Sequence, residues 1–197
     1  MKQAIAFFDF DGTITRKDTL FEMIRFQKGA MALYAGMALL LPLLVLFKLK
    51  VIGNQRMKEI VLKFYFKGTP LAEFQEKCNA FCKERLPALL RPRAVNAIAW
   101  HISEGHTVFI VTASAENWVQ PWAEKAGVPV LGSRLEVVNG RLTGALVGKN
   151  CNGDEKVCRI REAVKLTPYQ VVYAYGDSSG DREMLALAQH KGFREFE

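Results

Sequence analysis

The stretch AIAFFDFDGT, residues 4–13, decides the fold. Its first five residues form a continuous apolar run, which is typical of a parallel strand that helices bury on both faces. The run stops at Asp9, and Gly12 follows shortly after it. Similar apolar runs occupy residues 107–111 and 171–175. We therefore predict three parallel strands whose carboxyl ends meet at one edge of a sheet.

Helical segments alternate with these strands. Such alternation predicts an α/β fold built on a doubly wound parallel sheet. The expected helices cover residues 94–104, 116–126, 155–164 and 182–188. Asn139-Gly140 lies between two strand-like segments, residues 135–138 and 141–146, and predicts a small accessory hairpin because both central residues of its turn need positive φ.

Residues 19–90 interrupt this alternation with a long helical stretch. A chain of 197 residues suits one core with an inserted module. We therefore expect a core formed by residues 1–18 and 91–197, and an all-helical cap between them. Thr19 followed by Glu22 predicts a capping box at the first cap helix.

Residues 30–47 carry no charge and are apolar apart from Gly36 and Pro42. Their number reaches the lower limit for crossing a bilayer. A spanning helix would put the strand before Asp9 and the rest of its sheet on opposite sides of the membrane, so we do not expect one. Two interpretations remain: a kinked helix buried in the cap, or a segment that docks on lipid beside Lys48 and Lys50. We favour the second.

The distribution of charge and the cysteine content indicate which kinds of ligand and which cellular location the sequence suits. Residues 14–93 carry 15 Lys and Arg against 6 Asp and Glu, whereas the remainder carries 12 against 14. A basic module suits an anionic substrate or membrane headgroups. No nucleic-acid motif surrounds these cations, so we expect no nucleic-acid partner. The four cysteines lack metal spacing and no signal peptide precedes the first strand, which predicts reduced core thiols and a cytoplasmic location, with contact to the inner face of the membrane if residues 30–47 dock there.

Asp9 and Asp11 follow the first strand at a spacing that points both carboxylates to the same side. A nucleophile and a general acid need such neighbouring positions to reach one substrate. Gly12 would let the backbone approach a phosphate closely. A calcium loop would need further oxygen ligands and a terminal Glu that the sequence lacks.

Further polar residues follow the other two strands. Thr112 offers a hydroxyl to a phosphoryl oxygen, although Ser114 in the same stretch is also explained as a helix cap. Lys156 lies at a helix start, where the helix dipole disfavours a cation, and this indicates a functional role. Asp177 and Asp181 add two acids in a glycine-containing turn, and such hard oxygen ligands suit Mg²⁺.

In this order, Asp-x-Asp-Gly-Thr, a strand-end Thr, a Lys and Gly-Asp-x-x-x-Asp resemble the four motifs of the haloacid dehalogenase (HAD) superfamily, over residues 4–187. The position of the cap is similar to that of the phosphoserine phosphatase-like branch. Within that branch, Gly-x-Glu-Lys-Val around Lys156 and the apolar cap segment resemble the phosphatidylglycerophosphatase C type. The resemblance implies a Mg²⁺-dependent phosphomonoesterase with an aspartyl-phosphate intermediate, acting on a lipid phosphate such as phosphatidylglycerophosphate.

The resemblance also implies roles for individual residues. Catalysis would fall to Asp9 as nucleophile and Asp11 as acid and then base, with Thr112 and Lys156 holding phosphoryl oxygens. Mg²⁺ would be held by Asp9, the backbone carbonyl of Asp11 and Asp177, with Asp181 acting directly or through water. The substrate would be bound by Gly12, Ala113, Ser114 and Asp18. Asp18 stands where phosphoserine phosphatases use a Glu to bind the substrate ammonium, which argues against amino-acid specificity.

Three alternatives stay open. The first is a phosphatase of soluble esters of the phosphoserine type. The second is a phospho-accepting receiver domain, although receivers place their second acidic element before the Lys and lack an inserted cap. The third is a phosphoryl transferase or an inactive scaffold.

Overall fold

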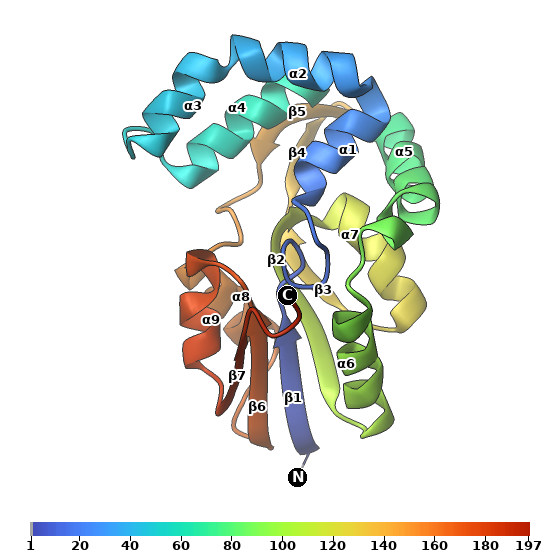
Figure 1. The fold of residues 1–197 in the computed structure, drawn as a ribbon, viewed down its shortest axis with the longest axis vertical. Helices are drawn as coiled ribbons and strands as arrows, with labels where there is room; N and C mark the ends of the chain where they lie inside the picture. The colour runs from blue at the N-terminus through green and yellow to red at the C-terminus, as the bar shows by residue number, and fades with distance from the viewer. Residues whose placement is uncertain (1) are drawn as a thin grey trace.

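A parallel sheet forms the centre of the molecule. The computed structural model describes the backbone of residues 2–197 and the side chains of residues 4–197. Within this range, five strands lie in the order β3-β2-β1-β6-β7, and each neighbouring pair is parallel (Figure 1). The expected α/β sheet is therefore confirmed. The strands are β1 (Lys2–Phe8), β2 (Thr107–Ala115), β3 (Val130–Ser133), β6 (Tyr169–Gly176) and β7 (His190–Phe193).

The apolar run of β1 explains why the sheet is covered on both faces. Its side chains alternate between two hydrophobic clusters. Ala6 and Phe8 pack on the side of α6 (Pro92–Ser103) and α7 (Glu116–Ala123), whereas Ile5 and Phe7 pack on the side of α8 (Asp154–Ala163) and α9 (Arg182–Ala186). These four side chains are fully buried. A strand buried on both faces needs a continuous apolar sequence, as β1 has.

Five helices lie beyond the carboxyl ends of the central strands (Figure 1). They are α1 (Thr19–Lys28), α2 (Ala30–Leu39), α3 (Leu41–Lys48), α4 (Asn54–Phe66) and α5 (Leu71–Glu84). The expected hairpin forms from β4 (Leu135–Val138) and β5 (Arg141–Leu146) and packs on α4. Gly144 permits this approach, because a Cβ there would lie 2.5 Å from the Cα of Lys63. We call α1–α5 together with this hairpin the cap.

Helices α2 and α3 form the outer edge of the cap. They meet at an angle of 64° around Leu40. Within the described residues, each is too short to cross a bilayer, although the bent pair together has the necessary length and composition. Their side chains are mostly exposed, so the interpretation of residues 30–47 as buried cap core is wrong for most of the segment. The exposed large apolar side chains of α2 and α3 are Met31, Tyr34, Leu39, Leu41, Val45, Leu46 and Phe47, and Leu49 and Val51 follow directly after α3.

The capping box predicted for Thr19 and Glu22 is wrong. Asp18 caps α1 instead, and its carboxylate accepts a hydrogen bond of 2.9 Å from the Leu20 amide. Glu22 pairs with Arg85, at 2.8 Å. An acidic side chain one residue earlier competes successfully for the cap position, because Asp is at least as good an N-cap as Thr.

The cysteines and the strands differ from the sequence prediction in smaller ways. Among the cysteines, Cys158 is exposed, whereas the other three are buried as expected. Strands β3 and β7, of four residues each, are absent from our sequence prediction. The predicted strands at residues 107–111 and 171–175 extend to Thr107–Ala115 and Tyr169–Gly176.

His101 lies buried between α6 and the sheet. Its ring nitrogens lie 2.8 Å from Nδ1 of His106 and 3.1 Å from the hydroxyl of Tyr175. Burial and, to a smaller extent, the neighbouring His106 together lower the pKa of His101 to about 4. The folded protein therefore keeps this imidazole neutral under conditions in which the unfolded chain would protonate it.

We expect the free energy of unfolding to fall as the pH drops from about 6.5 towards about 4, the ordinary and the folded pKa of His101. Between these two pH values the unfolded state binds a proton at His101 that the folded state does not bind. The contribution of His101 to the free energy of unfolding is therefore complete above this pH range and amounts to about 3 kcal/mol at most. Urea unfolding at several pH values measures it. His101→Asn should flatten the pH dependence relative to the unaltered protein, and an identical slope in both proteins would contradict this role.

Candidate active site

The carboxyl ends of three neighbouring strands bring the predicted site residues together. Asp9 follows β1, and its amide donates to the carbonyl of Tyr175 on β6, at 2.9 Å. Thr112 lies in β2, and Asp177 follows β6. Lys156 lies in the first turn of α8, which begins beside this edge of the sheet. The topology therefore brings Asp9 beside residues that lie more than 100 positions later in the sequence.

A buried ammonium group forms the centre of the site. Nζ of Lys156 lies 2.5 Å from Oδ1 of Asp9 and 2.6 Å from Oδ1 of Asp181, and it donates to the carbonyl of Val111 at 2.7 Å. Its side chain is 1% exposed. Burial alone would lower the pKa of Lys156, but the two carboxylates more than offset this and raise it. These contacts explain why a cation occupies an otherwise unfavourable helix start.

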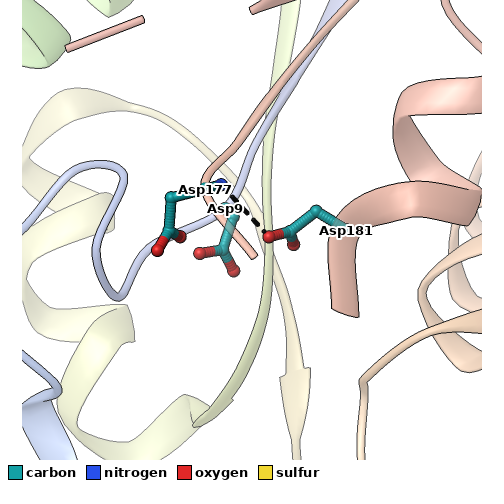
Figure 2. Close-up of side chains that lie close together, drawn as sticks. All are labelled: Asp9, Asp177 and Asp181. Atoms are coloured by element: carbon teal, nitrogen blue, oxygen red, sulfur yellow. Dashed lines mark hydrogen bonds between the residues drawn. The ribbon is translucent and has the colours of Figure 1, made fainter. Parts of the chain in front are cut away.

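Three carboxylates form an acidic cluster (Figure 2), and two of them are the ion-pair partners of Lys156. Asp9, Asp177 and Asp181 each place an oxygen within 4.8 Å of the others. Burial raises the pKa of Asp9 to about 8, against the lowering effect of Lys156. Burial and the neighbouring Asp181 likewise raise the pKa of Asp177. The raised pKa values mean that the carboxylates ionise together readily only with a further cation beside them, and their hard oxygen ligands are the kind that Mg²⁺ prefers.

Asp181 also braces the turn that carries it. Its Oδ2 accepts hydrogen bonds from the amide of Ser178 at 3.0 Å, from the Ser178 hydroxyl at 2.8 Å, and from the Asp177 amide at 3.2 Å, the last of which Figure 2 marks. Burial works against ionisation of Asp181, but Lys156 and Ser178 outweigh it and lower its pKa. Oδ1 of Asp181 accepts from Lys156, and a metal contact of Asp181, directly or through water, stays a prediction.

Gly12 allows the loop after β1 to approach Asp177. Its φ is +82°, and a Cβ at this position would lie 2.3 Å from Oδ2 of Asp177. Thr13 from the same loop donates to Oδ1 of Asp177 at 3.1 Å. The structure thus gives Gly12 a close contact with an acidic side chain, while the phosphate contact expected from the sequence stays a prediction.

The carboxylate of Asp11 lies outside the acidic cluster. Its Oδ1 accepts from the amide and the hydroxyl of Thr19, both at 2.6 Å, and its Oδ2 accepts from the hydroxyl of Ser114 at 2.5 Å. Asp11 and Asp9 nevertheless line the same cleft. The metal contact predicted for Asp11 concerns its backbone carbonyl and stays a prediction.

The three residues after Val111 differ in whether they are buried or line the cleft. Thr112 is fully buried, and its hydroxyl accepts from the Ser114 amide at 3.0 Å. Ala113 and Ser114 line the cleft. Ser114 is not a helix cap, since Ala115 precedes α7 and the Ser114 hydroxyl contacts Asp11.

The cleft lies between the cap and the sheet and has a volume of about 270 Å³. Its floor is polar and includes Asp9, Asp11 and Lys156. Asp18 lines it as well as capping α1. The cap contributes an apolar wall, formed by Leu20, Phe21, Leu44, Phe47, Met57 and Val61. The cleft can therefore take a ligand with a polar end and an apolar end.

Lys58 is a cleft residue that our sequence reasoning missed. It extends from α4, and Nζ donates to the carbonyl of Ala113 and, at 3.0 Å, to Oδ1 of Asn150. Burial lowers the pKa of Lys58 to about 8, although Asp11 and Asp18 oppose this. A signal was available, because Lys58 lies three and four residues before the buried Val61 and Leu62 and so shares the inward face of its helix.

Comparison with known proteins places the chain in a family. Residues 6–186 match the family of haloacid dehalogenase-like hydrolases. The protein CicA of Caulobacter vibrioides is 37% identical over 195 residues, which cover 96% of this chain and 85% of CicA.

Two solved structures share the fold. A Bordetella pertussis protein of unknown function has a TM-score of 0.85 at 20% identity, covering 97% of this chain and 89% of that one. A phospho-aspartyl intermediate analogue of phosphoserine phosphatase has a TM-score of 0.68 at 19% identity, covering 97% and 86%. The receiver alternative is therefore wrong, and the chain belongs to the haloacid dehalogenase-like hydrolases, as its four motifs predict.

Proposed function

We propose that this HAD-type phosphatase hydrolyses phosphate monoesters through an aspartyl-phosphate formed on Asp9, with Mg²⁺ as cofactor. The observation that carries the proposal is the placement of two carboxylates in one cleft in different surroundings. Asp9 is fixed by Lys156 within the acidic cluster, whereas Asp11 is held apart from it by hydroxyl groups. Such a pair supports a nucleophile and a separate general acid.

The reaction then proceeds in two steps, formation of the aspartyl-phosphate and its hydrolysis. The oxygen of Asp9 that is not bonded to Lys156 attacks phosphorus, the ester bond to the leaving oxygen breaks, and Asp11 gives that oxygen a proton. Asp11 next takes a proton from a water molecule, which attacks phosphorus and releases inorganic phosphate and Asp9. Lys156 orients Asp9, and Thr112 contributes to binding the phosphoryl group.

Mg²⁺ would be held by Asp9, Asp177 and the backbone carbonyl of Asp11, with Asp181 acting directly or through water. When bound, it supplies the positive charge that the acidic cluster and a phosphate dianion together require. Gly12, Ala113 and Ser114 would bind phosphoryl oxygens from the same edge of the sheet.

For the substrate, we propose a lipid phosphate such as phosphatidylglycerophosphate, bound at the inner face of the cytoplasmic membrane. Leu44 and Phe47 of α3 line the cleft, while Leu41 and Val45 of the same helix are exposed. The apolar wall of the cleft therefore continues onto the outer surface of the cap, where an acyl chain can follow it. Lys48 and Lys50 add positive charge there, suited to anionic headgroups.

The alternative substrate is a soluble phosphomonoester of the phosphoserine type. The polar part of the cleft favours it, because Asp18 and Lys58 offer opposite charges near Asp11. A transferase or scaffold has no comparable support from the arrangement of the site.

The first test is Asp9→Asn, which should lower turnover by about 10⁴-fold or more, because an amide is a poor nucleophile of nearly the same shape. Phosphate release from p-nitrophenyl phosphate measures activity, and circular dichroism checks the fold. Substantial activity in the folded variant would contradict an aspartyl-phosphate on Asp9.

Removal of metal should stop the reaction, and Mg²⁺ should restore it. Asp177→Asn should raise the Mg²⁺ concentration needed for half-maximal activity by about tenfold or more, because one anionic ligand is lost. Asp154→Asn is the matched control, since it removes an exposed carboxylate from the start of α8. Full activity after exhaustive chelation, or equal shifts in both variants, would overturn the metal role.

Membrane contact is tested by sedimentation with anionic vesicles. Leu41→Gln with Val45→Gln should reduce vesicle binding and hydrolysis of vesicle-borne lipid phosphate far more than hydrolysis of p-nitrophenyl phosphate. Ile102→Gln is the control, because this residue is similarly exposed on α6, away from the cap. Added salt should weaken the electrostatic part of binding. If the unaltered protein does not sediment with vesicles, the soluble substrate becomes the better proposal.

A further inference from the structure

Thr19 joins the general acid to both the cap and the core. It is the first residue of α1 and is fully buried, so it can act on the reaction only through its neighbours. Its amide and its hydroxyl both donate to Oδ1 of Asp11, at 2.6 Å. Asp18 already caps α1, so the Thr19 hydroxyl is not needed for that purpose.

The donors and acceptors around Thr19 fix its hydroxyl in one direction. Nε1 of Trp118 lies 3.0 Å from Oγ1 of Thr19, and an indole N–H can only donate. It therefore occupies a lone pair of Oγ1 and leaves the Thr19 proton to be donated to Asp11. Trp118 comes from α7 of the core and is itself fully buried, so this chain of hydrogen bonds has a rigid anchor.

Ser114 holds the other oxygen of the acid. Its hydroxyl lies 2.5 Å from Oδ2 of Asp11 and 3.1 Å from Oγ1 of Thr19. Each carboxylate oxygen has two lone-pair sites, so Oδ2 keeps one for the proton that passes to the leaving group. Ser114 lines the cleft beside Asp11, which places this oxygen on the substrate side.

We infer that Thr19 is a positioning residue for the general acid: its hydroxyl, oriented by Trp118, holds the Asp11 carboxylate where it protonates the leaving oxygen. This inference rests on the proposed function. Because Thr19 also begins the first cap helix, displacement of that helix would move the acid with it. Proton donation by Asp11 thereby depends on the position of the cap relative to the core.

The test compares two esters that differ in their need for an acid. A leaving alkoxide from butyl phosphate requires a proton, whereas p-nitrophenolate leaves as a stable anion. Thr19→Val keeps the amide donor and the shape but removes the hydroxyl. We expect it to lower kcat for butyl phosphate by about 10²-fold, the usual scale for a misplaced catalytic group, and to lower kcat for p-nitrophenyl phosphate much less. Thr19→Ser should restore most of the difference.

Thr15→Val is the matched control. Thr15 is also fully buried in the loop before α1, but its hydroxyl contacts the carbonyls of Phe10 and Lys17. Thr15→Val should change kcat for both esters by the same factor. An equal loss on both esters in Thr19→Val, or no recovery in Thr19→Ser, would overturn the inference. If Thr19→Val does not unfold cooperatively, Thr19→Ala replaces it, with the same expected discrimination.

Asp11→Asn separates this inference from the proposed function. It should show the same discrimination between the esters, only larger. If Asp11→Asn discriminates and the folded Thr19 variants do not, the positioning role alone fails. If the unaltered protein hydrolyses neither ester, the proposed function itself fails.

Discussion

The pairing of one buried ammonium group with two buried carboxylates constrains the rest of the structure. Lys156, Asp9 and Asp181 come from three separate segments, and their charges are acceptable in the interior only when they lie together. Removing one partner of such a group commonly costs about 3–5 kcal/mol, because the remaining charge is left uncompensated. The register of β1, the start of α8 and the turn after β6 are therefore tied to one another by electrostatics as well as by packing.

This constraint also separates the two catalytic carboxylates in character. Asp9 is surrounded by other charges, whereas Asp11 is surrounded by hydroxyl and amide donors. Neighbouring positions in the sequence thus acquire different electrostatic surroundings, because the loop after Phe10 turns Asp11 towards the cap. Different surroundings for two nearby acids are what acid and nucleophile roles require.

The sequence predicted the parts of the molecule that depend on local patterning. The run before Asp9 identified the central strand, and Asn139-Gly140 identified the hairpin, since each signal lies in a few adjacent residues. Strands β3 and β7 were not predicted from the sequence, because four residues give too little periodicity to recognise. The convergence of Asp9, Asp177 and Lys156 followed from strand order, which makes the acidic cluster predictable in outline.

Contacts between the cap and the core could not be predicted from the sequence. Helical spacing places Lys58 on the face of Val61, but it does not show that this face of α4 lies over Ala113. Thr19 likewise looks like a helix cap until Asp18 takes that position. The exposure of α2 and α3 likewise depends on which surfaces the neighbouring helices leave uncovered. Such features arise from tertiary packing, for which a single sequence carries no local signal.

The hairpin on α4 has a consequence for how the cap is built. Leu142 and Leu146 of β5 are buried within the same hydrophobic cluster as Val61 and Leu62 of α4. The cap therefore grows from two insertions in the core, one after β1 and one after β3, and four chain crossings tether it. Transplanting the helices alone to another core would leave part of their interior behind. The two insertions form one packing unit, although more than 40 residues of the core separate them.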